Sequence, residues 1–100
     1  MASKHELGPV GTNVLFENDK VKIWELVLEP GESSAWHHHA WDYITVGFME
    51  SVMDRELEDG TKDRTTPTPG GFRYAESHQP HRVTNAGDKR HRNLLIEIKE

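Results

Sequence analysis

Apolar residues in this chain occur in short stretches, many of them alternating with polar residues, and turn residues separate one stretch from the next. Alternation of this kind has the period of a β-strand, whereas no segment repeats apolar positions every 3.6 residues over three turns. The pattern therefore predicts about nine short strands and no long helix. The expected strands cover residues 14–16, 21–28, 35–39, 43–49, 52–58, 61–66, 72–75, 82–84 and 93–99.

Turn residues mark the ends of these stretches. Pro30-Gly31 ends the strand expected over 21–28, and Asp59-Gly60 is the kind of dipeptide that closes a hairpin between 52–58 and 61–66. Many short strands at regular spacing are typical of a small sandwich or barrel. We expect an N-terminal arm over residues 1–13, available to pair with a sheet edge, and a single barrel domain over 14–100.

Composition narrows the class of protein. One hundred residues are enough for one modest core, and although apolar residues make up only 34%, three Trp and three Phe residues can help to fill it. The absence of Cys excludes disulfides, thiolate metal sites and a Cys nucleophile. No apolar run approaches the roughly 20 residues of a membrane helix, and the first residues lack the apolar core of a signal peptide. We therefore expect a cytoplasmic protein with no membrane partner.

The formal charge of −5 argues against a nucleic acid as partner, because phosphate binding usually shows as a surplus of basic residues. The basic run at 89–92 lies between a turn and the last expected strand, so we interpret it as a solvated turn.

Seven histidines in 100 residues are the unusual feature of the composition. Side chains alternate between the faces of a strand, so His37 and His39 are expected on one face and His38 on the other. Two imidazoles about 6–7 Å apart along a strand can converge on one cation. A third ligand must come from elsewhere, and His81, beside another expected strand, is the best candidate. The remaining histidines, in or beside expected loops, are His5, His78 and His91.

The spacing of these residues resembles the two sequence motifs of the cupin family, G-x5-H-x-H-x3,4-E-x6-G and G-x5-P-x-G-x2-H-x3-N. The matching residues are Gly31, His37 and His39 in the first motif and Gly70, His81 and Asn85 in the second. The matched region covers more than half of the chain. The resemblance implies an all-β fold, the cupin-type double-stranded β-helix or jelly-roll barrel, with the three matched histidines as ligands of one divalent transition metal.

Four motif positions differ from the family pattern. Tyr43 stands where the first motif has its Glu ligand, and Glu50 replaces the closing Gly. In the second motif Glu76 replaces Pro and His78 replaces Gly. The three histidines therefore carry over from the family, but the fourth ligand does not.

The replacement by Tyr43 leaves three roles open for this side chain, which shares the strand face of the motif histidines. Its hydroxyl, neutral at a phenol's usual pKa of about 10, would hydrogen-bond metal-bound water, dioxygen or substrate. Ligation as a phenolate and a purely packing role are the alternatives. Glu76 and His78 are either an acid–base pair at the cavity mouth or exposed loop residues.

A site of three neutral imidazoles keeps the full charge of a divalent ion, so it favours a small oxygen-rich anion as substrate. Iron is the expected metal, and Mn, Ni, Co and Zn also suit imidazole ligands. Trp41 shares the expected face of Tyr43, so we expect it to wall the substrate pocket. Arg55 is a candidate carboxylate anchor in this pocket, with a surface position as the alternative.

Three functions are compatible with these residues. The first is a metal-dependent enzyme of dioxygenase, isomerase or lyase type, and the others are a non-catalytic ligand-binding barrel and a metal-free structural barrel. A looser likeness of residues 14–18 and of Asp42-Tyr43 to small cupins assigned to β-alanine degradation favours the enzyme. Because an exposed edge strand has to be covered, we also expect a homodimer.

Overall fold

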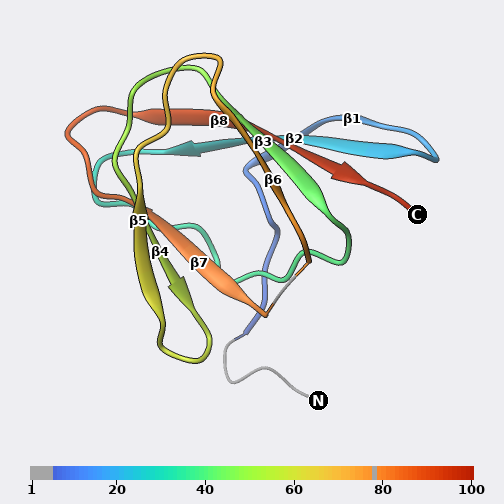
Figure 1. Ribbon diagram of the computed structural model, residues 1–100, viewed down its shortest axis with the longest axis horizontal. Helices are drawn as coiled ribbons and strands as arrows, with labels where there is room; N and C mark the ends of the chain where they lie inside the picture. The colour runs from blue at the N-terminus through green and yellow to red at the C-terminus, as the bar shows by residue number, and fades with distance from the viewer. Residues whose placement is uncertain (1–5, 78) are drawn as a thin grey trace.

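Eight strands form the part of the chain that this computed structural model describes, residues 6–77 and 79–100 (Figure 1). They are β1 (Asn13–Glu17), β2 (Val21–Leu28), β3 (Tyr43–Gly47), β4 (Met53–Leu57), β5 (Lys62–Thr65), β6 (Phe72–Ala75), β7 (His81–Asn85) and β8 (His91–Ile98). The larger sheet has the order β1-β2-β8-β3-β6, the smaller one has the order β5-β4-β7, and all pairings are antiparallel. The all-β expectation is confirmed.

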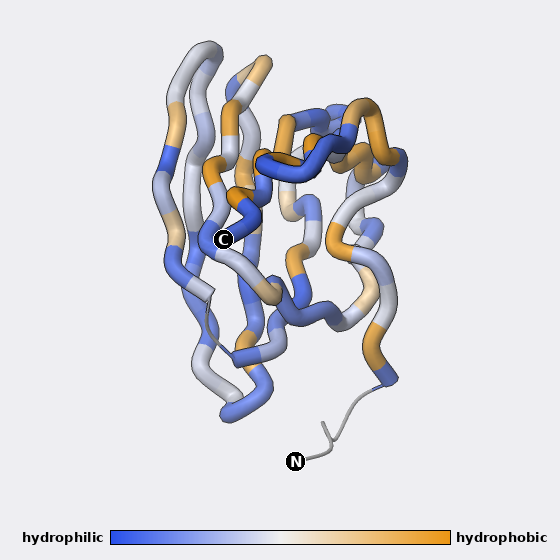
Figure 2. The backbone as a smooth tube through the Cα atoms, turned by 90° about the vertical axis from the view of Figure 1, so that its right-hand side faces the viewer, coloured by the Kyte–Doolittle hydropathy of each residue, from blue (hydrophilic) through white to orange (hydrophobic). Residues whose placement is uncertain are grey.

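The two sheets face each other as layers, which Figure 2 shows after a turn of 90° together with the alternation of hydrophobic and hydrophilic stretches along the chain. Side chains from the facing surfaces form the core: Leu26, Leu28, Tyr43, Met53 and Leu95. Within residues 6–77 and 79–100 there is no helix long and apolar enough to cross a bilayer.

The segment expected as a strand over 35–39 is not one. Among the described residues, the stretch from Ser33 to His37 makes two isolated β-bridges with β7, Ser33 with Thr84 and His37 with His81. His37 lies four residues after Ser33, whereas their partners His81 and Thr84 are only three residues apart. The register therefore shifts by one residue between the two bridges, and no continuous ladder forms. The segment still crosses from the larger sheet to β7.

Turn chemistry explains the connections that the sequence predicted. Gly60 has a φ of +92°, and the hairpin around Asp59-Gly60 joins β4 to β5 as expected. Gly31, with a φ of +82°, follows Pro30 at the end of β2. Its backbone N–H donates to Asn85 O at 2.8 Å, which brings the start of the first motif beside the end of the second.

The described residues before β1 pack against the chain's own barrel. Gly8 N donates to Trp36 O at 2.7 Å and Thr12 N donates to Glu25 O at 2.8 Å. Val10 is buried and contributes to the inner cavity.

Candidate functional site

A pair of reciprocal backbone hydrogen bonds brings the two motifs together. His37 N donates to His81 O and His81 N donates to His37 O, both at 2.9 Å. His37 belongs to the segment that crosses between the sheets, and His81 is the first residue of β7. The backbone thus places two candidate ligands side by side although 44 positions separate them in the sequence.

Three imidazoles converge at this point. The ring centroids of His37 and His81 are 4.5 Å apart, those of His37 and His39 are 5.0 Å apart, and those of His39 and His81 are 5.3 Å apart. One nitrogen from each ring lies within 4.8 Å of the other two, and all three side chains are buried. Since a metal–imidazole bond is about 2 Å long, three nitrogens grouped this closely are candidate ligands of one ion.

The protonation of these rings suits metal binding. Burial lowers the pKa of His39 to about 2 and the pKa of His81 to about 3, and it also lowers the pKa of His37, so all three are neutral at pH 7. His37 Nδ1 lies 2.8 Å from Ala35 O. Because a carbonyl oxygen only accepts, Nδ1 carries the proton and Nε2 keeps a lone pair for a ligand bond.

Glu97 lies behind His39. Its Oε1 accepts a hydrogen bond from Trp24 Nε1 at 2.7 Å, and its Oε2 lies 3.7 Å from His39 Nδ1. The latter distance is too long for a hydrogen bond, so His39 Nδ1 is a buried polar atom without a hydrogen-bond partner among residues 6–77 and 79–100. An imidazole with one nitrogen facing a carboxylate and the other free is a common arrangement for a metal ligand. Sequence patterns could not identify Glu97, because its place behind His39 depends on the pairing of strands.

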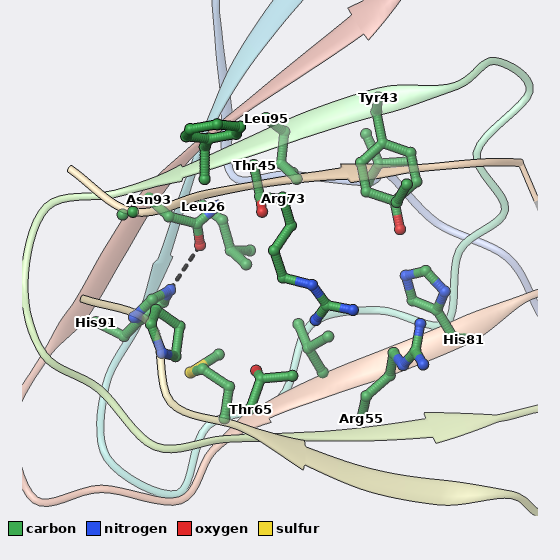
Figure 3. A pocket seen from close by; sticks show the side chains of 18 of the residues that line it. Leu26, Tyr43, Thr45, Arg55, Thr65, Arg73, His81, His91, Asn93 and Leu95 are labelled. Atoms are coloured by element: carbon green, nitrogen blue, oxygen red, sulfur yellow. Dashed lines mark hydrogen bonds between the residues drawn. The ribbon is translucent and has the colours of Figure 1, made fainter. Parts of the chain in front are cut away.

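Tyr43 stacks on His39, with ring centroids 3.7 Å apart and ring planes 13° apart. Burial raises the pKa of the Tyr43 hydroxyl, so the phenol is neutral. The hydroxyl faces the cavity (Figure 3). Tyr43 therefore offers a neutral hydrogen-bonding group beside the three histidines.

A cavity of about 300 Å³ extends from the three histidines between the two sheets (Figure 3). Apolar side chains such as Leu26, Met53 and Leu95 cover much of its wall. Arg55 also lines it, from β4, and donates two hydrogen bonds to the Asp63 carboxylate, from Nε at 3.1 Å and from Nη2. Arg55 thus lies in the pocket, one of its two predicted positions, and it is already paired with the Asp63 carboxylate.

Polar residues that sequence analysis did not single out line the rest of the cavity. Arg73 of β6 extends into its middle. At the end away from the three histidines, His91 Nε2 lies 2.6 Å from Asn93 Oδ1, and His91 Nδ1 lies 2.7 Å from Ser51 Oγ. His91 was expected in or beside a loop, and it lies beside one as the first residue of β8, where it is only 1% exposed.

The other predicted site residues lie apart from this cluster. Trp41 does not line the cavity, because residues 40 and 41 form a bend and the strand alternation does not extend across it. Its ring lies 5.9 Å from Lys99 Nζ instead. Glu76 is exposed and does not line the cavity either. His78, its predicted acid–base partner, lies outside the described residues.

Comparison with known proteins finds solved structures with the same architecture. No protein-family model and no curated protein sequence matches the chain. Among solved structures, a cupin domain from Bordetella pertussis Tohama I is similar, with a TM-score of 0.81 and 27% identity over 93% of this chain and 100% of that one.

Two more distant structures share the fold. An RmlC-like cupin family protein with a double-stranded β-helix fold, from Methanocaldococcus jannaschii, has a TM-score of 0.72 and 16% identity over 98% of this chain and 83% of its own. A sugar phosphate isomerase from a cupin superfamily, from Silicibacter pomeroyi, has a TM-score of 0.57 and 19% identity over 81% of this chain and 52% of its own. The motif spacing, the antiparallel all-β architecture and the likeness to a whole cupin domain agree, so this chain has the cupin fold.

Proposed function

We propose that this protein is a metal-dependent cupin enzyme that acts on a small oxygen-rich anion, with His37, His39 and His81 holding one divalent transition metal. The proposed ion is Fe(II), and Mn, Ni, Co and Zn are the alternatives that imidazole ligands also suit. The reaction would be an oxygenation, an isomerisation or a lyase reaction. The named activity of the Silicibacter protein adds no weight, because a likeness at 19% identity concerns the fold alone.

One observation carries the proposal: three buried, neutral imidazoles converge at one end of a cavity whose described lining contains arginines but no Asp or Glu side chain. Buried histidines are usually hydrogen-bonded, yet His39 Nδ1 has no hydrogen-bond partner in the part of the chain that the structure describes. A cation held by neutral ligands in such a cavity keeps its charge and attracts an anion. Such a local positive charge would attract small anions even though the net charge of the chain is −5.

The side chains around the histidines have separable roles. A divalent ion, when bound, supplies a Lewis acid with open coordination positions. Tyr43 can donate a hydrogen bond from its neutral hydroxyl to an oxygen of the substrate. The apolar wall at Leu26, Met53 and Leu95 excludes water, and this strengthens the electrostatic interactions inside the cavity.

The test is the metal content of tag-free protein, measured by mass spectrometry for the parent, His81→Ala and His38→Ala. His38 is exposed and adjoins two ligands in sequence, so it is a matched control. We expect near-stoichiometric metal in the parent and in His38→Ala, and its loss in His81→Ala. Little metal in the parent, with no thermal stabilisation by any of the five candidate ions, would contradict the proposal.

If the parent retains its metal, a second experiment must distinguish a metal-dependent enzyme from a non-catalytic binding module. Oxygen uptake or conversion of a small hydroxy or keto acid, lost in His81→Ala, would support the enzyme. Stabilisation by such anions without turnover in any screen would indicate the non-catalytic binding module instead.

A further inference from the structure

We propose that Arg73 is the carboxylate anchor of this cavity, so that the substrate class is a small two-headed anion. One oxygen-bearing end would lie at the three histidines and a carboxylate would lie against the Arg73 guanidinium. This inference rests on the proposed function, because it takes the histidine end as the place where the other head of the substrate is bound.

The two arginines that line the cavity differ in their hydrogen bonds and ion pairs. Arg55 has its Nε and Nη2 bonded to the two oxygens of Asp63, the fork geometry that a substrate carboxylate would require. No hydrogen bond or ion pair to Arg73 is found within the described residues. Asp63 therefore pairs with Arg55, and although its charge also attracts Arg73, no described residue bonds the Arg73 guanidinium, which is left to receive a ligand.

The position of Arg73 also fits an anchor. β6 is the edge strand of the larger sheet, and Arg73 extends from it into the middle of the cavity, between His81 and Tyr43 at one end and His91 and Asn93 at the other (Figure 3). Although the residue as a whole is exposed, its side chain lines the cavity. A cation at such an edge can meet an anion from solvent and guide it inward.

A neighbouring hydroxyl completes the subsite. Thr45 of β3 is the register partner of Arg73, so the two side chains lie on the same face of the sheet. Thr45 also lines the cavity. A carboxylate held by the planar guanidinium can therefore accept a further hydrogen bond from the Thr45 hydroxyl, which favours a carboxylate over a halide or another spherical anion.

The experiment measures the binding of malonate, succinate and glutarate by calorimetry, with butyrate as the single-headed analogue of succinate. Parent, Arg73→Met, Arg73→Lys and Arg90→Met are compared, each loaded with redox-inert Zn(II) and each metal-free. Arg90 is a matched control because it is exposed, pairs with Glu29 and lies outside the cavity. Metal content and the melting temperature are measured for every variant.

We expect the best dicarboxylate to bind Zn(II)-loaded Arg73→Met at least tenfold more weakly than the parent, with metal content, folding and butyrate binding unchanged. Arg73→Lys should lie between, because Lys keeps the charge but not the fork, and Arg90→Met should match the parent. Equal dicarboxylate affinity in parent and folded Arg73→Met would overturn the inference, as would failure of all three dicarboxylates to bind the parent.

The metal-free arm separates the two proposals. If the parent retains no Zn(II) but its dicarboxylate binding still falls in Arg73→Met, the metal site fails and the Arg73 anchor stands. If Zn(II) is retained and Arg73→Met binds as the parent does, the metal site stands and the anchor fails.

Discussion

His91 is a buried histidine that lies away from the proposed ligands. Its ring is held between Ser51 and Asn93, and its Nε2 must carry the proton because Asn93 Oδ1 accepts there. Asn93 Nδ2 in turn donates to Leu94 O, which fixes the orientation of the amide. Burial lowers the pKa of His91, and the hydrogen bond to Asn93 opposes this only in part. The folded protein therefore holds this ring neutral.

This arrangement predicts a loss of stability in mild acid. The unfolded chain protonates His91 near pH 6.5 while the folded chain resists, so its contribution is fully present above pH 6.5 and is lost as pH falls below it. From pH 7 to pH 5 we therefore expect the Tm to fall, with part of the fall due to His91. Thermal melts at both pH values measure it.

His91→Gln is the comparison for this prediction, because its amide keeps a hydrogen-bond donor but does not titrate. The variant should lose less Tm between pH 7 and pH 5 than the parent in the same metal state. Parallel pH profiles for the two proteins would show that His91 is not involved. The three metal-site histidines contribute equally to both profiles.

Sequence patterns could identify only some of the residues in this cavity. His37, His39, His81 and Tyr43 were accessible because motif spacing is local and because alternation places neighbours in sequence on one face. The importance of Arg73 follows instead from the Asp63 carboxylate that holds Arg55, a contact between two strands. A contact between two strands cannot be predicted from the sequence pattern of either strand alone.

At the scale of elements, the link between β5 and β6 is fastened to β3. Gly47 N donates to Gly71 O and Gly70 N donates to Gly47 O, both at 2.9 Å. A Cβ at position 47 would lie 2.8 Å from Thr68 O, a backbone atom that cannot move without its loop. Gly47 therefore permits a close approach that closes the cavity near its Asn93 end, since Gly47 and Asn93 are register partners.

Gly47→Ala should accordingly destabilise the fold by about 1–3 kcal/mol, the range for forcing an extra methyl group into a packed site. Denaturant unfolding measures this change. Gly87→Ala is the control, because the nearest atom to its Cβ would be the Asn85 side-chain oxygen at 3.3 Å, and it should cost less. Equal stability of Gly47→Ala and the parent would mean that the loop is not held as described.

Strand prediction succeeded where pairing is continuous and failed where it is not. The hairpin at 59–60 is encoded by its own dipeptide, so β4 and β5 were predictable. The segment at 35–39 has strand-like composition, but its register with β7 shifts by one residue between the two bridges, so it does not form a strand. The bend at Ala40–Trp41 likewise carried Trp41 away from the cavity that alternation predicted for it.

At the scale of the molecule, the face of the larger sheet that points away from the cavity is apolar. Register partners form one row across all five strands: Phe16, Ile23, Ile96, Ile44 and Tyr74. Phe16 is 52% exposed and Tyr74 is 57% exposed, and Phe72 near the row, which also borders the cavity, is 74% exposed. The exposed parts of these aromatic residues and of the half-buried isoleucines form an apolar strip on the surface, and exposed apolar surface of this kind marks an interaction site.

We expect this face to join two copies of the chain. The row has an aromatic residue at each end and isoleucines between, so it is complementary to itself when reversed, as a twofold contact requires. Light scattering should give twice 11.5 kDa for the parent at micromolar concentration and a monomer for Phe16→Glu. Leu7→Glu, a similar change at an exposed residue of the N-terminal segment, should leave the dimer intact, and a monomeric parent would contradict the expectation.

The paired backbones of His37 and His81 also tie together the solvent exposure of these two amides. Because each N–H is bonded to the other's carbonyl, an opening fluctuation of the backbone breaks both bonds together. The two amide protons should therefore show similar protection in hydrogen exchange.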